Sequence, residues 1–177
     1  PEVINWRDYW INVHLPGLAR HVYPDFERRL KERRKDVHTA ADLMEVFQSS
    51  AENFGDRVAL QQMTSKGTRR FTYAQLSERA GWVAAQLHAH GLSNGDRLLL
   101  MSENRPEWAM AYFGILQADG TAAPADAELS LPEVMNLARS CRAFAVVASD
   151  KVQTRLRGEG LDEALAQLAE EGIELKM

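Results

Sequence analysis

The sequence predicts an α/β domain in which a parallel sheet is flanked by helices, with a β-hairpin and an N-terminal arm before it. Between residues 98 and 148, short apolar runs alternate with amphipathic stretches, as strand and helix do in units of this class. Residues 58–73 contain two strand-like runs joined by a loop with glycine. The composition, 45% hydrophobic and 26% charged, is that of a folded protein.

The length of 177 residues fits about one domain. Trp6, Tyr9 and Trp10 crowd the start of the chain, and a turn-prone stretch follows at residues 14–17. We therefore assign residues 1–38 to an N-terminal arm that packs through these aromatic side chains. We assign residues 39–177 to a single α/β domain, because no internal repeat or flexible linker divides them.

A helix is predicted over residues 39–53, where four apolar side chains recur near helical spacing, and Gly55 is placed at its end as a cap. Strands are predicted over residues 58–63 and 69–73. The connecting loop, residues 64–68, combines Ser, Thr, Gly and Lys, which superficially resembles a phosphate-binding loop. Such loops are Gly-rich and open a helix, whereas this one joins two strands, so we predict a plain hairpin turn.

A second helix is predicted over residues 73–90. Thr72 can cap it, with Gln75 at the capping-box position three residues later. His88 and His90 lie two residues apart near its end, on different faces, so this pair does not predict a metal site.

The rest of the chain is predicted to alternate strand and helix. Because crossovers between strands of one sheet are right-handed, the three strands should be parallel. A further helix and the start of another strand close the sequence. The predicted elements are strand 98–101, helix 105–118, strand 120–124, helix 131–140, strand 144–148, helix 161–171 and strand 173–177.

The net charge of −4 argues against a nucleic-acid-binding protein, which would carry a basic excess. Residues 20–35 are locally basic, with seven basic against three acidic residues, and two interpretations stay open for them: a solvated helix or peripheral contact with an anionic membrane. Cys141 is the single cysteine, which excludes an intrachain disulfide and fits a reducing, cytoplasmic location. We expect it to be a small buried thiol at a helix-to-strand corner.

Polar side chains that follow predicted parallel strands are the candidates for a site, because ligands of such sheets collect at the carboxyl ends of the strands. Ser102, Glu103 and Asn104 follow one strand and Asp126 follows another. Residues 102–104 also suit a helix start, so capping and ligand contact are both open for them.

Several signatures of catalytic sites are absent from the sequence. No Gly-x-Gly-x-x-Gly follows a predicted strand, and there is no Walker-type phosphate loop, no metal-ligand spacing of Cys and His, and no Gly-x-Ser-x-Gly. We therefore predict no catalytic, cofactor-binding or metal-binding residue within this chain.

Four motifs in this order resemble one known family. They are the Phe71-Thr72-Tyr73 strand end, Gly95-Asp96-Arg97, Asn104-Arg105-Pro106-Glu107-Trp108 and the Ala118-Asp119-Gly120 turn. Together they resemble the N-terminal part of AMP-forming acyl-CoA synthetases, the fatty acid–CoA ligase type of the adenylate-forming ligases. The resemblance covers about residues 40–150.

The resemblance implies a partial N-terminal domain of an adenylate-forming enzyme. The parent would use ATP and Mg²⁺ to convert a carboxylic acid, a fatty acid by preference, into an acyl-adenylate, and would then transfer it to coenzyme A. The family's catalytic motifs, a Ser/Thr/Gly-rich loop ending in Pro-Lys-Gly, an acidic ATP-binding motif and a C-terminal lysine, do not occur before Met177. An isolated N-terminal fragment of this kind is expected to be inactive and to bind no cofactor.

Two other interpretations stay open. A truncated relative could fold alone as a non-catalytic interaction module, and an exposed sheet edge would then drive homo-oligomerisation. A small nucleotide-sensing domain of flavodoxin-like topology would instead bind AMP or ATP without help from other segments. Pro1 in place of methionine indicates that the chain begins inside a longer product.

Overall fold

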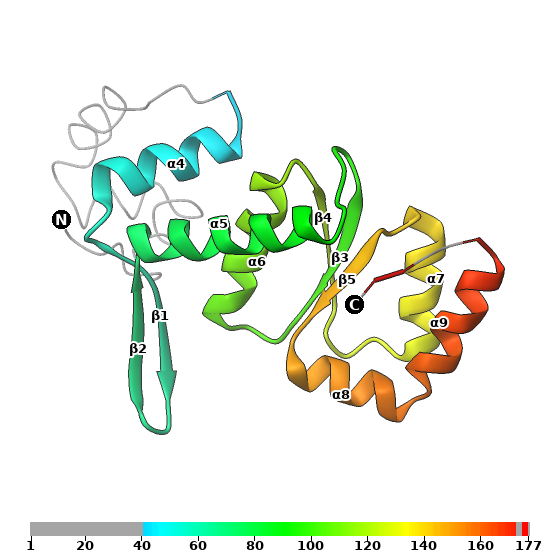
Figure 1. Ribbon diagram of the computed structural model, residues 1–177. Helices are drawn as coiled ribbons and strands as arrows, with labels where there is room; N and C mark the ends of the chain where they lie inside the picture. Colours follow the sequence, from blue (N-terminus) through cyan, green and yellow to red (C-terminus); the bar gives the residue numbers. More distant parts are fainter. Residues whose placement is uncertain (1–40, 173–174, 177) are drawn as a thin grey trace, which may run out of the picture. The chain divides into compact units, whose positions relative to one another are not determined.

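The computed structural model describes residues 41–172, 175 and 176, and Asp42–Met177 form one compact unit (Figure 1). The predicted arm, residues 1–38, lies outside the described residues, as does the basic segment 20–35. In chain order the elements are α4 (Leu43–Phe54), β1 (Val58–Thr64), β2 (Gly67–Thr72), α5 (Tyr73–Ala89), β3 (Arg97–Met101), α6 (Pro106–Gln117), β4 (Thr121–Ala125), α7 (Leu131–Cys141), β5 (Ala145–Ala148), α8 (Asp150–Gly158) and α9 (Leu161–Glu170).

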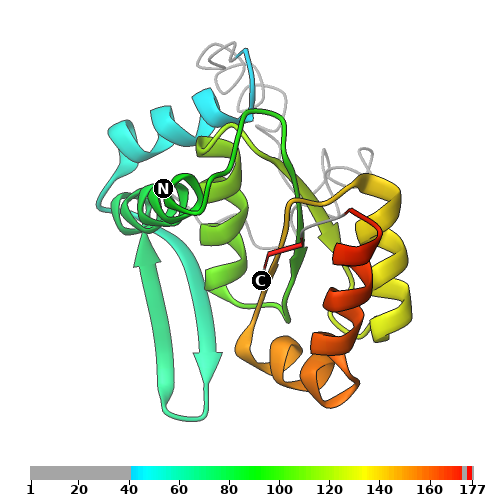
Figure 2. The same ribbon diagram turned by 45° about the vertical axis from the view of Figure 1, so that its right-hand side comes forward.

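The predicted fold class is confirmed: a parallel sheet of order β4-β3-β5 stands between two groups of helices (Figures 1 and 2). The central strand serves both faces. Its Leu98 and Leu100 pack with α5 and α6, whereas Leu99 and Met101 pack with α7, α8 and α9. All four side chains are at most 2% exposed, which explains why this strand reads as a continuous apolar run.

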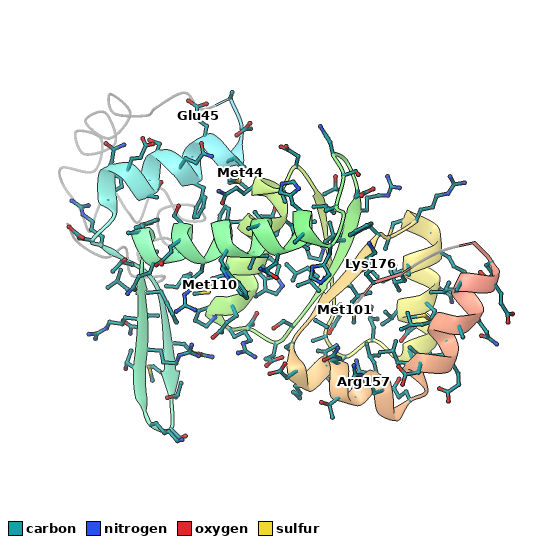
Figure 3. The ribbon with its side chains drawn as sticks, viewed as in Figure 1. Met44, Glu45, Met101, Met110, Arg157 and Lys176 are labelled. Atoms are coloured by element: carbon teal, nitrogen blue, oxygen red, sulfur yellow. The ribbon has the colours of Figure 1, made fainter. Side chains whose placement is uncertain are left out.

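A third apolar cluster joins α4, α5 and α6. Phe47, Leu76, Ala80 and Met110 are buried there, and Met110 can be found on α6 in Figure 3. The ring of Phe47 stacks on that of Phe113 with centroids 4.0 Å apart. This cluster fixes α4 and the base of the hairpin to the rest of the unit.

The hairpin is confirmed, with β1 and β2 antiparallel and Thr64 paired with Gly67. Its loop is the plain turn that we predicted. The Thr64 hydroxyl donates to the Gly67 carbonyl at 2.7 Å, and the Lys66 backbone N–H donates to that hydroxyl at 3.2 Å. All residues from 63 to 70 are exposed.

Helix starts show where local sequence was informative. At α5 the capping box is present as predicted: the Gln75 N–H donates to the Thr72 hydroxyl at 3.2 Å, and the Thr72 N–H donates to the Gln75 side chain at 3.0 Å. The predicted start of α4 near residue 39 was wrong, because Asp42 is the cap and its carboxylate accepts the Glu45 N–H at 2.8 Å. Gly55 does end α4, but with right-handed φ of −46°.

The structure differs from the prediction in three further ways. It contains α8, where the sequence analysis predicted no helix. The final predicted strand appears only as a single bridge between Ala145 and Lys176, and residues 173, 174 and 177 lie outside the described part. Cys141 does end α7 at the helix-to-strand corner, yet it is only half-buried.

Candidate functional site

The three parallel strands end at one edge of the sheet. Register places Met101, at the end of β3, beside Ala125 of β4 and Ala148 of β5. Figure 3 labels Met101 at this position. The segments that follow, residues 102–105, 126–130 and 149–150, therefore meet at the carboxyl edge, where open parallel sheets bind ligands.

A depression of about 560 Å³ lies over the ends of β3 and β4. Ser102, Glu103, Asn104 and Asp126 all line it, so the structure brings together the four residues that the strand-end rule selected. Trp108 and Glu128 complete its polar and aromatic wall.

A smaller cavity of about 230 Å³ adjoins it over the ends of β3 and β5. Its lining includes the apolar side chains of Leu100, Ala111 and Val147 and the polar side chains of Ser149 and Asp150. Ser102 and Trp108 line both spaces, so these two side chains form the wall between them.

Capping does not explain residues 102–104, contrary to one of the two interpretations. The N-cap of α6 is Arg105, and no side chain caps it. Ser102 Oγ instead donates to the Glu103 carbonyl at 2.9 Å. Among the described residues, the exposed Asn104 side chain has no hydrogen-bond partner, and Asn104 lines the depression.

A chain of charged groups runs along this edge. Glu103 Oε2 accepts the Ser149 hydroxyl at 2.6 Å, and Glu103 Oε1 lies 3.4 Å from Arg105 Nη1. Arg105 Nε donates to Glu107 Oε2 at 2.9 Å, and Arg69 of β2 donates to Glu107 Oε1 at 2.7 Å. The chain ties the hairpin to the start of α6 and to the cap of α8, where Ser149 Oγ also accepts the Val152 N–H at 3.3 Å.

These contacts shift the acidities of the groups that make them. The hydrogen bonds from Arg105 and, secondarily, Arg69 lower the pKa of Glu107 to about 2. The Ser149 hydroxyl holds the pKa of Glu103 below its usual value, and the bond to Glu107 raises the pKa of Arg105. Both carboxylates are therefore ionised at neutral pH, and both arginines are committed to them.

The other side of the depression is held by turns and one arginine. Asp126 Oδ1 accepts the Glu128 N–H at 2.9 Å. Arg155 of α8 donates to the carbonyls of Ala127 and Leu129, each at 2.8 Å. These two bonds hold the segment that follows β4 against α8.

These residues do not fit a triphosphate. Glu103, Asp126 and Glu128 surround the larger depression with negative charge, and Arg105 is already paired. Within the described part of the chain, no three His, Cys, Asp or Glu side chains are placed to hold a metal ion. The described helices include none that is long and apolar enough to cross a bilayer.

Sequence reasoning missed Ser149, Glu128 and Trp108. Ser149 could have been found with the same strand-end rule, since it directly follows the third predicted strand. Trp108 carries no such signal, because it lies in the first turn of α6 and not directly after a strand.

A family model described as AMP-binding enzyme matches residues 47–176. The chain belongs to the AMP-binding enzyme family. The match spans the hairpin, the sheet and the carboxyl-edge depression, and it confirms the family that the four sequence motifs indicated.

Curated proteins similar to this chain include ligases of different acids. The crotonobetaine/carnitine–CoA ligase of Proteus mirabilis is 29% identical over 116 residues, which are 65% of this chain and 22% of that protein. The salicyl-AMP ligase / salicyl-S-ArCP synthetase of Mycobacterium tuberculosis is 32% identical over 103 residues, 58% of this chain and 18% of that protein. The chain thus spans about a fifth of the length of these relatives.

A solved structure shares the fold. The fatty acyl-adenylate ligase from L. pneumophila, in complex with acyl adenylate and pyrophosphate, superposes with a TM-score of 0.59 at 23% identity. The superposition covers 64% of this chain and 20% of that chain. The described residues therefore share the fold of the matching part of that ligase.

Proposed function

We propose that this chain is the N-terminal portion of an AMP-forming acid–thiol ligase, an acyl-CoA synthetase. In the reaction the substrate carboxylate attacks the α-phosphorus of ATP and releases pyrophosphate, and the thiol of coenzyme A then displaces AMP to form a thioester. Mg²⁺ would balance the charge of the phosphates. The observation that carries the proposal is the family match over residues 47–176.

The described residues have a scaffold role in this proposal. They supply three strands and the acidic, Trp-containing wall of the depression at the carboxyl edge. Because that wall repels phosphate oxygens and carboxylates alike, we place it away from the triphosphate and beside the part of the acid that is remote from its carboxylate. The isolated chain is then inactive.

The proposed acid is a fatty acid and the proposed thiol is coenzyme A. The aromatic and basic sequence of residues 1–38 supports the fatty acid, and the crotonobetaine/carnitine–CoA ligase supports coenzyme A. The similarity to the salicyl-AMP ligase supports an aryl acid as the alternative substrate. We propose a cytoplasmic location because Cys141 is unpaired, with residues 20–35 as the point of any peripheral membrane contact.

The test is acid-dependent release of pyrophosphate, measured for the product of the whole reading frame and for the 177-residue chain. Palmitate, salicylate and carnitine serve as the acids. We expect release by the whole product with one class of acid and none by the 177-residue chain. A reading frame that stops at Met177, or a whole product that releases no pyrophosphate with any acid, would favour the non-catalytic interaction module.

A matched pair of variants tests the place of the depression. Asp126→Asn removes one charge from its wall, and Asp162→Asn makes the same change at an exposed position of α9. In the whole product we expect the first to change the KM for the acid several-fold and the second to leave it unchanged. Equal KM values for both variants would mean that the depression is not part of the substrate site.

A further inference from the structure

The segment between β4 and α7, residues 126–130, belongs to neither a strand nor a helix. Its Asp126 and Glu128 line the depression at the carboxyl edge. The Glu128 N–H donates to Asp126 Oδ1 at 2.9 Å, and the Leu129 N–H donates to the Asp126 carbonyl at 3.4 Å. Both bonds stay within the segment, so its place in the domain depends on contacts from another element.

The last turn of α8 supplies those contacts. Arg155 Nη2 donates to the carbonyls of Ala127 and Leu129, each at 2.8 Å. In the described part of the chain neither carbonyl accepts a backbone N–H, and both residues are half-buried. Removing the guanidinium would leave two half-buried acceptors without a donor, which disfavours the present path of the segment. Figures 1 and 2 show this segment running beside α8.

A carboxylate on the same helix fixes the arginine in turn. Glu159 Oε1 accepts Arg155 Nη1 at 2.6 Å, and Glu159 Oε2 accepts the Leu131 N–H at 2.8 Å. The bonds from the Leu131 N–H and from Arg155 hold the pKa of Glu159 below its usual value. The planar guanidinium thus joins one carboxylate to two carbonyls, an arrangement that suits arginine and not lysine.

The wall that follows β3 is bound to α8 as well. Ser149, the N-cap of α8, donates to Glu103 Oε2 at 2.6 Å, and Glu103 lines the depression. One helix therefore holds both walls, through Ser149 at its start and Arg155 in its last turn. Arg155 itself lines neither of the two cavities at this edge.

We propose that Arg155 is a positioning residue for the substrate acid: it holds residues 126–130 so that Asp126 and Glu128 form the wall of the depression. The proposal rests on the proposed function, in which the part of the acid remote from its carboxylate lies beside this wall. Binding sites depend on such supporting bonds for their geometry. Loss of Arg155 should weaken binding of the acid and spare the chemical step, which takes place at the other end of the acid.

The steady-state kinetics of pyrophosphate release by the whole product test this role. Arg155→Gln should raise the KM for the acid several-fold and leave kcat nearly unchanged, whereas a purely structural loss would lower the amount of active protein and leave KM unchanged. Arg157→Gln is the matched control, because Arg157 is exposed in the same last turn of α8, and Figure 3 labels it. This control should keep the KM and kcat of the unmodified protein.

A double-mutant cycle shows whether Arg155 acts through the wall. Asp126→Asn should change KM less in the Arg155→Gln background than in the unmodified protein, since Asp126 has then already left the wall. Arg155→Lys, which keeps the charge but has one nitrogen in place of the fork, should raise KM less than Arg155→Gln does. It replaces Arg155→Gln in all assays if circular dichroism shows that the latter does not fold.

Amide hydrogen exchange in the 177-residue chain tests the same contacts without catalysis. The Glu128 and Leu131 amides should exchange faster in Arg155→Gln and at the unmodified rate in Arg157→Gln. Equal exchange in the two variants, equal KM values, or additive effects of Arg155→Gln and Asp126→Asn would each overturn the proposal. A whole product that releases no pyrophosphate with any acid refutes the proposed function instead, and the exchange rates then decide whether Arg155 holds the segment.

Discussion

Replacing Gly114 by alanine should destabilise the domain, even though alanine is the better helix former. Gly114 is buried in α6, where α5 approaches closely. A Cβ there would lie 2.6 Å from Val83 Cβ, 2.7 Å from Val83 Cγ1 and 2.9 Å from the Ala80 carbonyl oxygen, whereas ordinary contacts begin near 3.4 Å. To relieve these contacts, α5 and α6 would have to move apart locally by the amount by which the distances fall short of 3.4 Å.

The expected magnitude follows from two opposing terms. Overpacking typically costs about 1–3 kcal/mol, and the upper end applies here because one neighbour is backbone and the other is a β-branched side chain with little rotamer freedom. Alanine recovers about 1 kcal/mol of helix propensity. We expect the free energy of unfolding to fall by about 2 kcal/mol.

Urea unfolding followed by circular dichroism measures this change, and Gly81→Ala in α5 is the matched control. A Cβ at Gly81 meets nothing closer than the Gln117 side-chain nitrogen at 3.6 Å, so this variant should be more stable by up to about 1 kcal/mol. A Gly114→Ala variant as stable as the unmodified protein, or an equal loss in both variants, would refute the close-packing explanation.

Three other changes test single contacts. Glu107→Gln removes a carboxylate whose folded pKa of about 2 is below its unfolded value of 4.5; the stability that this carboxylate contributes is present above pH 4.5 and is lost as pH falls toward 2. Because Glu107 is 35% exposed, we expect a loss of about 1 kcal/mol at pH 7 that shrinks by pH 3 in urea titrations at both pH values. Thr72→Ala removes half of a capping box and should cost about 1 kcal/mol in the same assay, with no loss refuting the role of the cap. Leu156→Ala empties a fully buried site on α8 and should cost about 2–5 kcal/mol, whereas Leu137→Ala, 40% exposed on α7, should cost far less; equal losses would mean that α8 does not pack as described.

The sequence predicted what depends on near neighbours in the chain. The capping box of Thr72 and Gln75 spans four residues, and the apolar run of β3 identifies a strand buried on both faces. α8 escaped prediction because its apolar side chains are essentially Val152 and Leu156, and their burial comes from packing with α7 and α9 rather than from a broad apolar stripe.

The candidate site was also predictable only in part from the sequence. Parallel strands must end together, so chain order alone placed Ser102 and Asp126 at one depression. The fate of each side chain there was not predictable, because it depends on contacts over long sequence separations. Glu103 bonds to Ser149, and Glu107 bonds to Arg69 of the hairpin, so the segment between them is held by tertiary bonds instead of by a helix cap.

The central position of β3 makes the two helical layers depend on each other for their stability. Leu98 and Leu100 complete one apolar cluster and Leu99 and Met101 complete the other, so neither cluster can persist once this strand leaves the sheet. Unfolding of either layer should therefore carry the other with it in one cooperative transition. The amide hydrogens of β3 would then exchange with solvent only through global unfolding, more slowly than those of the hairpin, which can open without disturbing the sheet.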